Sequence, residues 1–299
     1  MAVTDVGIGA GALGKTMAAA ILQFIKAAVF QPIINMVACA KGTNVAQIPV
    51  YTKQALSIVT TNATGDEETT GSAESVTSVA SNLEVFRNNV YAQITDLTTF
   101  GNADAFLVNA GRMLGNTVAA HFDEEGCTLM DTFSTAVGGA AVSMNMGVLF
   151  DAVAGLEGSD APRGYSAVLH PLQVWGSFGL TNELSNVAVL QSNAGLSQSQ
   201  GVGEEYRRAG FAQTVGGVDI YTSPQVVSTS DQHKGGIFAK DAISCAYIDQ
   251  GGGNFIQIET DRNAPAASTE VVANGYFNLA VTVNDHGREV LTETSTYSE

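Results

Sequence analysis

The sequence predicts an α+β protein organised around one long helix, and three observations lead to that fold class. Asn102–Gly126 carries apolar side chains at helical spacing, which form one broad buried stripe. Residues 42–95 alternate in strand fashion around a polar, acidic tip, and the last third of the chain contains several more strand patterns. The helix therefore lies between an extended region and a compact mixed α/β region, and we expect it to act as a spine.

The ends of this helix are predicted from capping residues. Asn102 is an N-cap candidate, and Gly126 supplies a C-terminal stop. Asp123, Glu124 and Glu125 would then crowd a helix C-terminus, where the macrodipole disfavours negative charge. Two interpretations remain open: a solvated acidic end, or carboxylates that meet an arginine from another subunit.

The composition indicates a globular, acidic protein. The 299 residues are 45% hydrophobic with a mean hydropathy of +0.13, and 13 Lys and Arg against 29 Asp and Glu give a net charge of -16. A protein that binds nucleic acid tightly normally carries a basic face, and this balance does not supply one. An acidic wall that lies close to nucleic acid without binding it stays possible.

Cysteine and histidine usage predicts neither disulfides nor metal. The cysteines are odd in number and far apart, so a reducing compartment is the expected place of folding. No histidine has a partner at ligand spacing, so we expect no structural metal and no cofactor. These residues are Cys39, Cys127, Cys245, His121, His170, His233 and His286.

The apolar stretch Ala18–Ala40 is predicted to be a helical arm rather than a membrane segment. Lys26 and Pro32 interrupt it, so no clean run of about 20 apolar residues remains. A signal peptide would carry its charge before the apolar run and a small-residue cleavage site after it; here Lys15 precedes the run, but Lys26 lies within it. We expect the arm to end near Pro32.

The segment Gly9–Thr16 fits the phosphate-binding loop pattern GxxxxGK[ST]. In such a loop, the backbone amides after Gly9 and Gly14 would cradle phosphate, Lys15 would reach the terminal phosphate and Thr16 would hold magnesium. The pattern needs a buried strand directly before it, which Ala2–Ile8 offers only weakly. The alternative is a flexible lead-in to the arm helix. A Walker-B-like partner exists at Val148–Asp151, but the apolar residues there have helical rather than strand spacing.

Residues 42–95 predict a long two-stranded excursion with little core of its own. Asn44–Tyr51 and Ser57–Thr61 are strand-like, and Val76–Val85 forms the return segment. The tip between them, Asn62–Ser72, contains Asp66, Glu67 and Glu68. A two-stranded arm is marginal in isolation, so we expect it to lie on a neighbouring molecule.

The region after the spine alternates between short helices and strands. The expected elements are a helix at Asn145–Ala154, a turn at Gly155–Gly164, a strand at Tyr165–Leu169, a helix at Pro171–Phe178 with the sole tryptophan Trp175, a loop at Gln191–Glu205 and a strand at Val215–Tyr221. The last third is predicted to contain strands at Gly235–Ile248, Asn254–Thr260 and Glu270–Val283, then a hairpin turn at Asn284–Gly287 into Glu289–Thr292.

This order of segments resembles the major capsid protein of tailed bacteriophages, which has the HK-97-like fold. Ser166–Pro171 (SAVLHP) is similar to the strand-to-helix entry of that family's axial domain, and Gly217–Tyr221 followed by Ser223 is similar to a later strand. Gly236–Ile243, Ile258–Arg262 and the end of the chain through Gly287 resemble its closing peripheral-domain sheet. The resemblance spans nearly the whole chain through loose patterns.

The resemblance implies a division of the chain into five regions. These are an N-terminal arm (1–41), an extended β-loop with its return strand (42–95), the spine helix of the peripheral domain (96–128), a mainly axial domain (129–222), and a mainly peripheral β-sheet with a closing hairpin (223–299).

The function that the resemblance implies is structural. Pentamers and hexamers of the subunit would close an icosahedral head around double-stranded DNA without binding it specifically. The partners would be other copies of the chain, a separate scaffolding protein because the arm is short, a portal and a possible decoration protein, with no membrane. The protein would be assembled in the host bacterial cytoplasm and reside in the virion.

Contacts between subunits are expected at charged residues of the loop and the spine. The candidates are Lys53, Asp66, Glu67, Glu68, Asp123, Glu124 and Glu125. Covalent cross-linking, known in some members of the family, would need a loop lysine such as Lys53 with Asn and Glu partners. No such triad can be assigned, so we do not expect cross-linking.

An enzyme is not expected, because the sequence contains no GxSxG, HExxH or spaced Cys/His pattern. Two alternatives stay open beside the capsid. One is a phosphate-loop NTPase that uses Lys15 and Thr16. The other is a bacterial nanocompartment shell of the same fold, which would enclose cargo enzymes instead of a genome.

Overall fold

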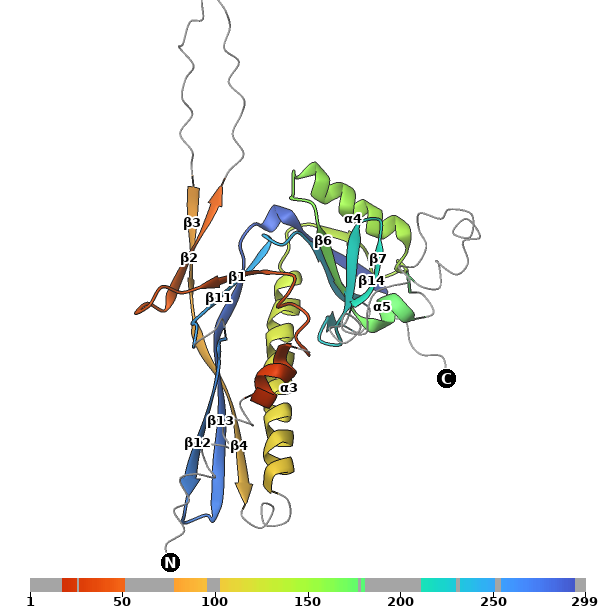
Figure 1. Cartoon of the computed structure of the whole chain (residues 1–299). Helices are drawn as coiled ribbons and strands as arrows, with labels where there is room; N and C mark the ends of the chain where they lie inside the picture. The colour runs from red at the N-terminus through yellow and green to blue at the C-terminus, as the bar shows by residue number, and fades with distance from the viewer. Residues whose placement is uncertain are drawn as a thin grey trace, which may run out of the picture.

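A computed structural model of the chain describes residues 18–25, 27–51, 78–95, 103–176, 179–180, 211–229, 232–250 and 254–293. The long helix α3 (Ala103–Met130) runs alongside a narrow β-ribbon, and a second unit with its own sheet and helices lies at the C-terminal end of α3 (Figure 1). Gly9, Gly14, Lys15, Thr16, Lys53, Asp66, Glu67 and Glu68 lie outside the described residues, as do Ser57–Thr61 and Gln191–Glu205.

The first sheet is built around one 14-residue strand, β13 (Ser268–Val281). Two antiparallel neighbours flank its first half: β12 (Ile256–Asn263) on one edge and β4 (Phe86–Thr95) on the other. Its second half pairs with β11 (Ile243–Tyr247), which in turn pairs in parallel with β1 (Asn35–Ala38). This sheet is assembled from three distant segments of the sequence.

The core between α3 and this sheet is aromatic. Phe122 of α3 lies 5.1 Å from Phe277 of β13 between ring centroids, and 5.9 Å from Phe255. Phe24, from the helix over residues 18–25, completes the cluster at 5.1 Å from Phe255. Edge-to-face and offset pairs of this kind add to the free energy of burial. The N-terminal arm therefore contributes to the core of this unit.

The second sheet has mixed strand directions, with β6 parallel to β8 and β5 parallel to β14. The helices α4 (Met146–Gly158) and α5 (Pro171–Trp175) belong to this unit. In order across the sheet the strands are β5 (Ala136–Gly138), β14 (Gly287–Glu293), β10 (Gln232–Phe238), β6 (Tyr165–Leu169), β8 (Val218–Thr222) and β7 (Phe211–Val215), with β9 (Val227–Ser228) paired to β10.

Both helices of this unit begin where the sequence supplies a cap. The side chain of Asn145 accepts a hydrogen bond from the amide of Val148 at the start of α4, which confirms the predicted helix and its N-terminus. At α5, His170 Nδ1 accepts from the amide of Leu172, and Pro171 occupies the first turn. The strand at Tyr165–Leu169 is also confirmed, with the predicted bounds.

The predicted excursion of residues 42–95 is present as a two-stranded ribbon. The strands β2 (Val45–Tyr51) and β3 (Ser78–Glu84) pair only with each other and project away from the rest of the molecule (Figure 1). Among the described residues of this ribbon, packed side chains form a small cluster that contains Ile48 and Leu83 and includes Ala246 of β11. The chain continues almost directly from β3 into β4, so the ribbon is an extension of the first sheet's edge.

The predicted stop of the spine helix at Gly126 is wrong, because α3 continues to Met130. Gly126 lies within the helix, where a Cβ would come within 2.8 Å of the Phe30 ring. The glycine is therefore needed for the close approach of the arm to the spine, rather than for a left-handed cap. Gly115 has the same role nearer the start of the helix, against the backbone of Ala20.

Three strand predictions are also corrected. Val215–Tyr221 is two strands, because Gly216 and Gly217 adopt φ values of 60° and 83° and turn the chain. Gly235–Ile248 divides into β10 and β11, which belong to different sheets. The expected hairpin at Asn284–Gly287 is a short 3-10 turn between β13 and β14, which do not pair with each other. Residues 223–299 therefore contribute to both sheets.

Candidate assembly surfaces

Among the described residues, no three or more His, Cys, Asp and Glu side chains are placed to hold a metal ion. Burial raises the pKa of both Cys127 and Cys245, so their thiols stay protonated at neutral pH. Within the same residues, no helix combines the length and the apolar composition needed to cross a membrane.

Asp123, expected among the surface contacts, is in the interior and is only 5% exposed. Its carboxylate accepts hydrogen bonds from the amides of Val29 and Phe30 at 3.0 to 3.1 Å. Burial raises the pKa of this carboxyl to about 6, against the opposing effect of the two amides. Asp123 is therefore neither a solvated carboxylate at the helix end nor a partner for an arginine of another subunit. It holds the arm against the spine within its own chain.

Glu124 and Glu125 remain near the surface, beside His121. Glu125 Oε1 lies 3.1 Å from His121 Nε2, and Glu124 Oε2 lies 3.8 Å from His121 Nδ1. The Glu124 side chain is 65% exposed. Of the acidic cluster at residues 123–125, Glu124 is thus the member that stays available to a neighbouring molecule.

The arm is fastened to the spine along its length. Gln23 Nε2 donates to Asn116 Oδ1 at 2.8 Å, and the Phe30 ring covers Gly126. Together with the Asp123 hydrogen bonds, these contacts fix residues 18–34 on α3. The first sheet, the spine and the arm therefore form one packed unit.

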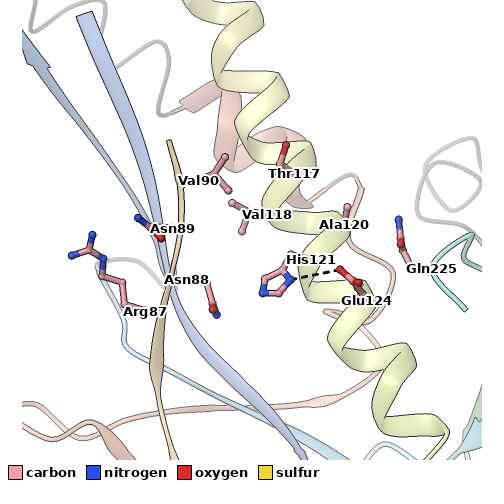
Figure 2. Close-up of a pocket in the computed structure, with 10 residues that line it drawn as sticks. All are labelled: Arg87, Asn88, Asn89, Val90, Thr117, Val118, Ala120, His121, Glu124 and Gln225. Carbon is pink, nitrogen blue, oxygen red and sulfur yellow. Dashed lines mark ion pairs between the residues drawn. The ribbon is translucent and has the colours of Figure 1, made fainter. Parts of the chain in front are cut away.

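A groove of about 520 Å³ lies between α3 and β4 (Figure 2). The helix side carries Thr117, His121 and Glu124, and the strand side carries Asn88 and Val90. Figure 2 shows Asn88 and Val90 on the helix side of β4, while Arg87 and Asn89 point away from α3. Arg87 and Asn89 also border the groove, so its strand side includes residues from both faces of β4.

The side of the β12–β13–β4 ribbon that faces away from α3 is here called the outer face. Register places Arg87 beside Tyr276, Asn89 beside Asn274, and Tyr91 beside Val272 on this face. Tyr91 is 53% exposed, and Asn274 Oδ1 is buried with no hydrogen-bond partner among the described residues. This face was not predicted from the sequence. The sequence indicates it only through the alternation in Phe86–Thr95, where the odd-numbered positions carry polar or large side chains.

The second unit contains a buried polar cluster around α5. The rings of His170 and His233 stack 4.2 Å apart between centroids, and burial lowers the pKa of both, to about 4 for His170. Gln173 Nε2 donates to Thr292 Oγ1 at 2.9 Å and links α5 to β14. These contacts indicate a neutral, structural pair of histidines at neutral pH.

An ion pair joins the two units where the spine ends. Lys234 Nζ of β10 lies 2.6 Å from Asp131 Oδ1, directly after α3. Glu289 of β14 is nearby; burial and the neighbouring Asp131 raise the pKa of its carboxyl to about 7. This cluster fixes the end of α3 to the second sheet.

The comparisons with known proteins give no match by sequence: no protein-family model matches the chain, and no curated protein does. Solved structures do match. The capsid of Ralstonia phage GP4 aligns with a TM-score of 0.66 at 14% identity, over 92% of this chain and 93% of that one. The capsid of cyanophage Pam1 aligns with a TM-score of 0.60 at 12% identity, over 91% and 93%.

A shell that is not described as a phage capsid also matches. A holo-SrpI encapsulin complex from Synechococcus elongatus aligns with a TM-score of 0.58 at 10% identity, over 90% of this chain and 88% of that one. Likeness at these identities identifies the fold. The chain has the α+β, HK-97-like fold that the sequence predicts, over nearly its whole length.

Proposed function

We propose that this chain is the major capsid subunit of a tailed bacteriophage, which assembles into pentamers and hexamers of an icosahedral head around double-stranded DNA. The observation that carries the proposal is the HK-97-like fold over about nine-tenths of the chain, in common with the capsids of Ralstonia phage GP4 and cyanophage Pam1. The protein would act as a structural component and not as an enzyme.

The physical features of the chain support a shell subunit. A ribbon that pairs only with itself and projects from the body is stabilised when it lies on a neighbour. The spine and arm supply a rigid body from which such a ribbon can project. A net charge of -16 suits the wall of a container for DNA, since a wall that bound phosphate would hinder packaging and release.

The regions take the roles expected from the resemblance, with one revision. Residues 42–95 would form the loop that lies over the next subunit, and α3 would be the spine of the peripheral domain. The second sheet would be the core of the axial domain, so this domain would include β10 and β14 in addition to most of residues 129–222. The remaining strands of residues 223–299 would belong to the peripheral domain.

The proposed partners are other copies of the chain, a separate scaffolding protein, a portal and a possible decoration protein. The subunit would be assembled in the host bacterial cytoplasm and reside in the virion. DNA would be enclosed without a specific binding site. The proposed function does not need a cofactor.

The test is negative-stain electron microscopy of the purified protein, expressed alone and with its neighbouring genes. Uniform closed shells, or rings of five and six, are expected. DNA protected from nuclease inside the particles would support a virion, and protein cargo instead would favour a nanocompartment shell. A stable monomer that binds ATP and never assembles would overturn the proposal in favour of the phosphate-loop alternative.

A further inference from the structure

The junction between the spine and the second sheet encloses a glutamate whose carboxyl lacks a full set of hydrogen-bond partners. Glu289, on β14, is 8% exposed, and its Oε1 is buried with no partner among the described residues. Its backbone amide donates to the carbonyl of Thr135, in the turn that follows α3. A buried carboxylate without donors is unfavourable, so the side chain of Glu289 needs either a donor or a proton.

Close packing at the junction holds this carboxyl in place. Gly236 of β10 lies opposite Glu289 in the sheet, and a Cβ on that glycine would come within 2.7 Å of Met130 Sδ at the end of α3. The ring of Phe133 covers Gly287 in the same way. The end of α3 and the turn after it therefore lie directly on the β10–β14 pair, so Glu289 gains water only if this junction loosens.

The charged groups that face Glu289 are Asp131, in the turn after α3, and Lys234 of β10. Lys234 Nζ lies 2.6 Å from Asp131 Oδ1, and this hydrogen bond raises the pKa of the lysine. Burial raises the pKa of Glu289 to about 7, and the hydrogen bond and charge of Asp131 act in the same direction. The three side chains together are neutral when Glu289 is protonated, and carry a single negative charge when it is ionised.

The elements packed around these three side chains supply no second cation. Residues 127–130 at the end of α3 and the strand β5 contain no charged residue. Lys234 is the one cation that faces Glu289 among the described residues, and Asp131 already holds it. The other charged groups nearby have partners elsewhere: Glu293 accepts from Ser143, His286 pairs with Asp241, and Arg288 donates to Gly155 on the opposite face of β14.

We propose that Glu289, Asp131 and Lys234 form a proton-dependent latch between the spine and the second sheet. With a proton on Glu289, its carboxyl donates to Asp131, which also accepts from Lys234, so a continuous chain of hydrogen bonds closes the junction. When the proton is lost to solvent, two carboxylates share one ammonium in a buried site, and the junction loosens. This latch acts within one subunit, so it is independent of the proposed assembly.

The direction of the pH dependence follows from the two states of the junction. In the closed state the pKa of Glu289 is about 7, and in the loosened state it returns toward its ordinary value of 4.5. Between these values the closed state holds a proton that the loosened state has released. Loosening therefore becomes more favourable as pH rises toward 7 and levels off above it, so acid closes the latch.

Amide hydrogen exchange of the unassembled, full-length subunit measures the loosening. Peptides that cover residues 131–138 and 287–293 report on the junction, and a peptide from β13, in the first sheet, is the internal reference. After correction for intrinsic exchange rates, the junction peptides should lose protection by roughly tenfold between pH 6 and pH 8, and the reference should not. Asp123 adds little in this window, because its pKa is about 6.

Two variants at the latch and one control test the assignment. Glu289→Gln imitates the protonated carboxyl, because its amide can donate to Asp131 at every pH, and protection should change by less than about twofold across the window. Asp131→Asn should move the loss of protection to lower pH, because an asparagine amide can donate to the ionised Glu289. Glu293→Gln, at the next carboxyl on the same face of β14, is the matched control and should keep the full loss.

The contrary outcomes each overturn the latch. Protection that does not change with pH in the unaltered chain would show that Glu289 does not control the junction. The full loss in Glu289→Gln, or its disappearance in Glu293→Gln, would assign the effect to other groups. If Glu289→Gln does not fold, Asp131→Asn decides the matter, and a loss at the same pH as in the unaltered chain overturns the latch. Failure of the chain to form shells would contradict the proposed function alone.

Discussion

Asp123 on the spine helix accepts a hydrogen bond from the backbone amide of Val29, with 3.0 Å between Oδ1 and N, although the two residues are 94 positions apart in the sequence. The same carboxylate accepts from the amide of Phe30 at 3.1 Å. One side chain therefore closes the turn after the arm helix and fixes the arm to the spine. The contact lies between two segments that are both central to the proposed shell subunit.

Substitution Asp123→Ala should destabilise the subunit. Two buried amides would lose their acceptor, which corresponds to about 2–4 kcal/mol of unfolding free energy. Urea unfolding of the unassembled subunit measures this loss. Glu124→Ala, one residue away on the exposed side, is the control and should change the unfolding free energy by less than about 0.5 kcal/mol. Equal effects of the two substitutions would contradict the anchoring role of Asp123.

The same carboxyl should make stability depend on pH. Its folded-state pKa of about 6 exceeds the ordinary value of 3.8, because burial disfavours the charge. Between these values the folded state holds a proton that the unfolded state has released, so this contribution to stability falls as pH rises from 3.8 to 6 and is constant above. In the Asp123→Asn variant, the urea midpoint should change less with pH across this window. An unchanged dependence of the midpoint on pH would contradict the assignment of this effect to Asp123.

Gly126→Ala should destabilise the spine, contrary to helix propensity. Alanine normally stabilises a helix interior by about 1 kcal/mol relative to glycine. Here its Cβ would lie 2.8 Å from the Phe30 ring, so we expect a net loss of about 1–3 kcal/mol. Gly158→Ala, at the end of α4 with no atom within 4 Å of the added Cβ, is the matched control and should be neutral or stabilising. Thermal unfolding of both variants decides the point.

Arg288→Lys should weaken the junction between α4 and β14. The buried guanidinium donates from one nitrogen to Gly155 O and Ser159 Oγ, and from the other to the carbonyls of Asp285 and Gly287. Lysine keeps the charge but cannot reproduce this fork, so the unfolding free energy should fall by about 2–3 kcal/mol. Chemical denaturation tests this, with Arg163→Lys as the exposed control. An Arg288→Lys variant with an unchanged unfolding free energy would show that the positive charge alone is sufficient.

Deletion of Gly65–Gly71 should separate folding from assembly. The described core contains none of these residues, so the subunit should remain folded by circular dichroism and remain soluble. Shells should fail to close, because the tip of the projecting ribbon would no longer reach its neighbour. Electron microscopy of the deletion beside the unaltered chain provides the test, and normal shells would show that the loop assignment is mistaken.

Local sequence patterns were sufficient for the elements whose start is encoded by neighbouring residues. The spine helix and α4 follow from their apolar period, and α5 follows from Pro171 at its first turn. The strand at Tyr165–Leu169 follows from a short apolar run between turn residues. In each case the determining interaction lies within a few residues, so the sequence contains it directly.

The candidate surfaces were harder to predict because they depend on pairing between distant strands. The acidic run Asp66–Glu68 was visible in the sequence, but the outer face of the β12–β13–β4 ribbon was not. Arg87 and Tyr91 share a face by strand alternation, but the pairing of β4 with β13, nearly 200 residues later in the chain, decides that this face is turned away from α3. When the odd-numbered and the even-numbered positions of a strand both contain polar residues, the sequence does not indicate which face of the strand a helix will cover.

By itself, the sequence determined the fold class, the spine, the two-stranded excursion and the acidic balance, because periodicity, caps and charge are local or additive properties. Only the tertiary structure decided that Gly126 admits the Phe30 ring, that Asp123 is buried beneath the arm, and that β13 and β14 belong to different sheets. These outcomes depend on which surfaces meet across long sequence separations, where burial and close packing outweigh the local preference for a cap, a solvated carboxylate or a hairpin.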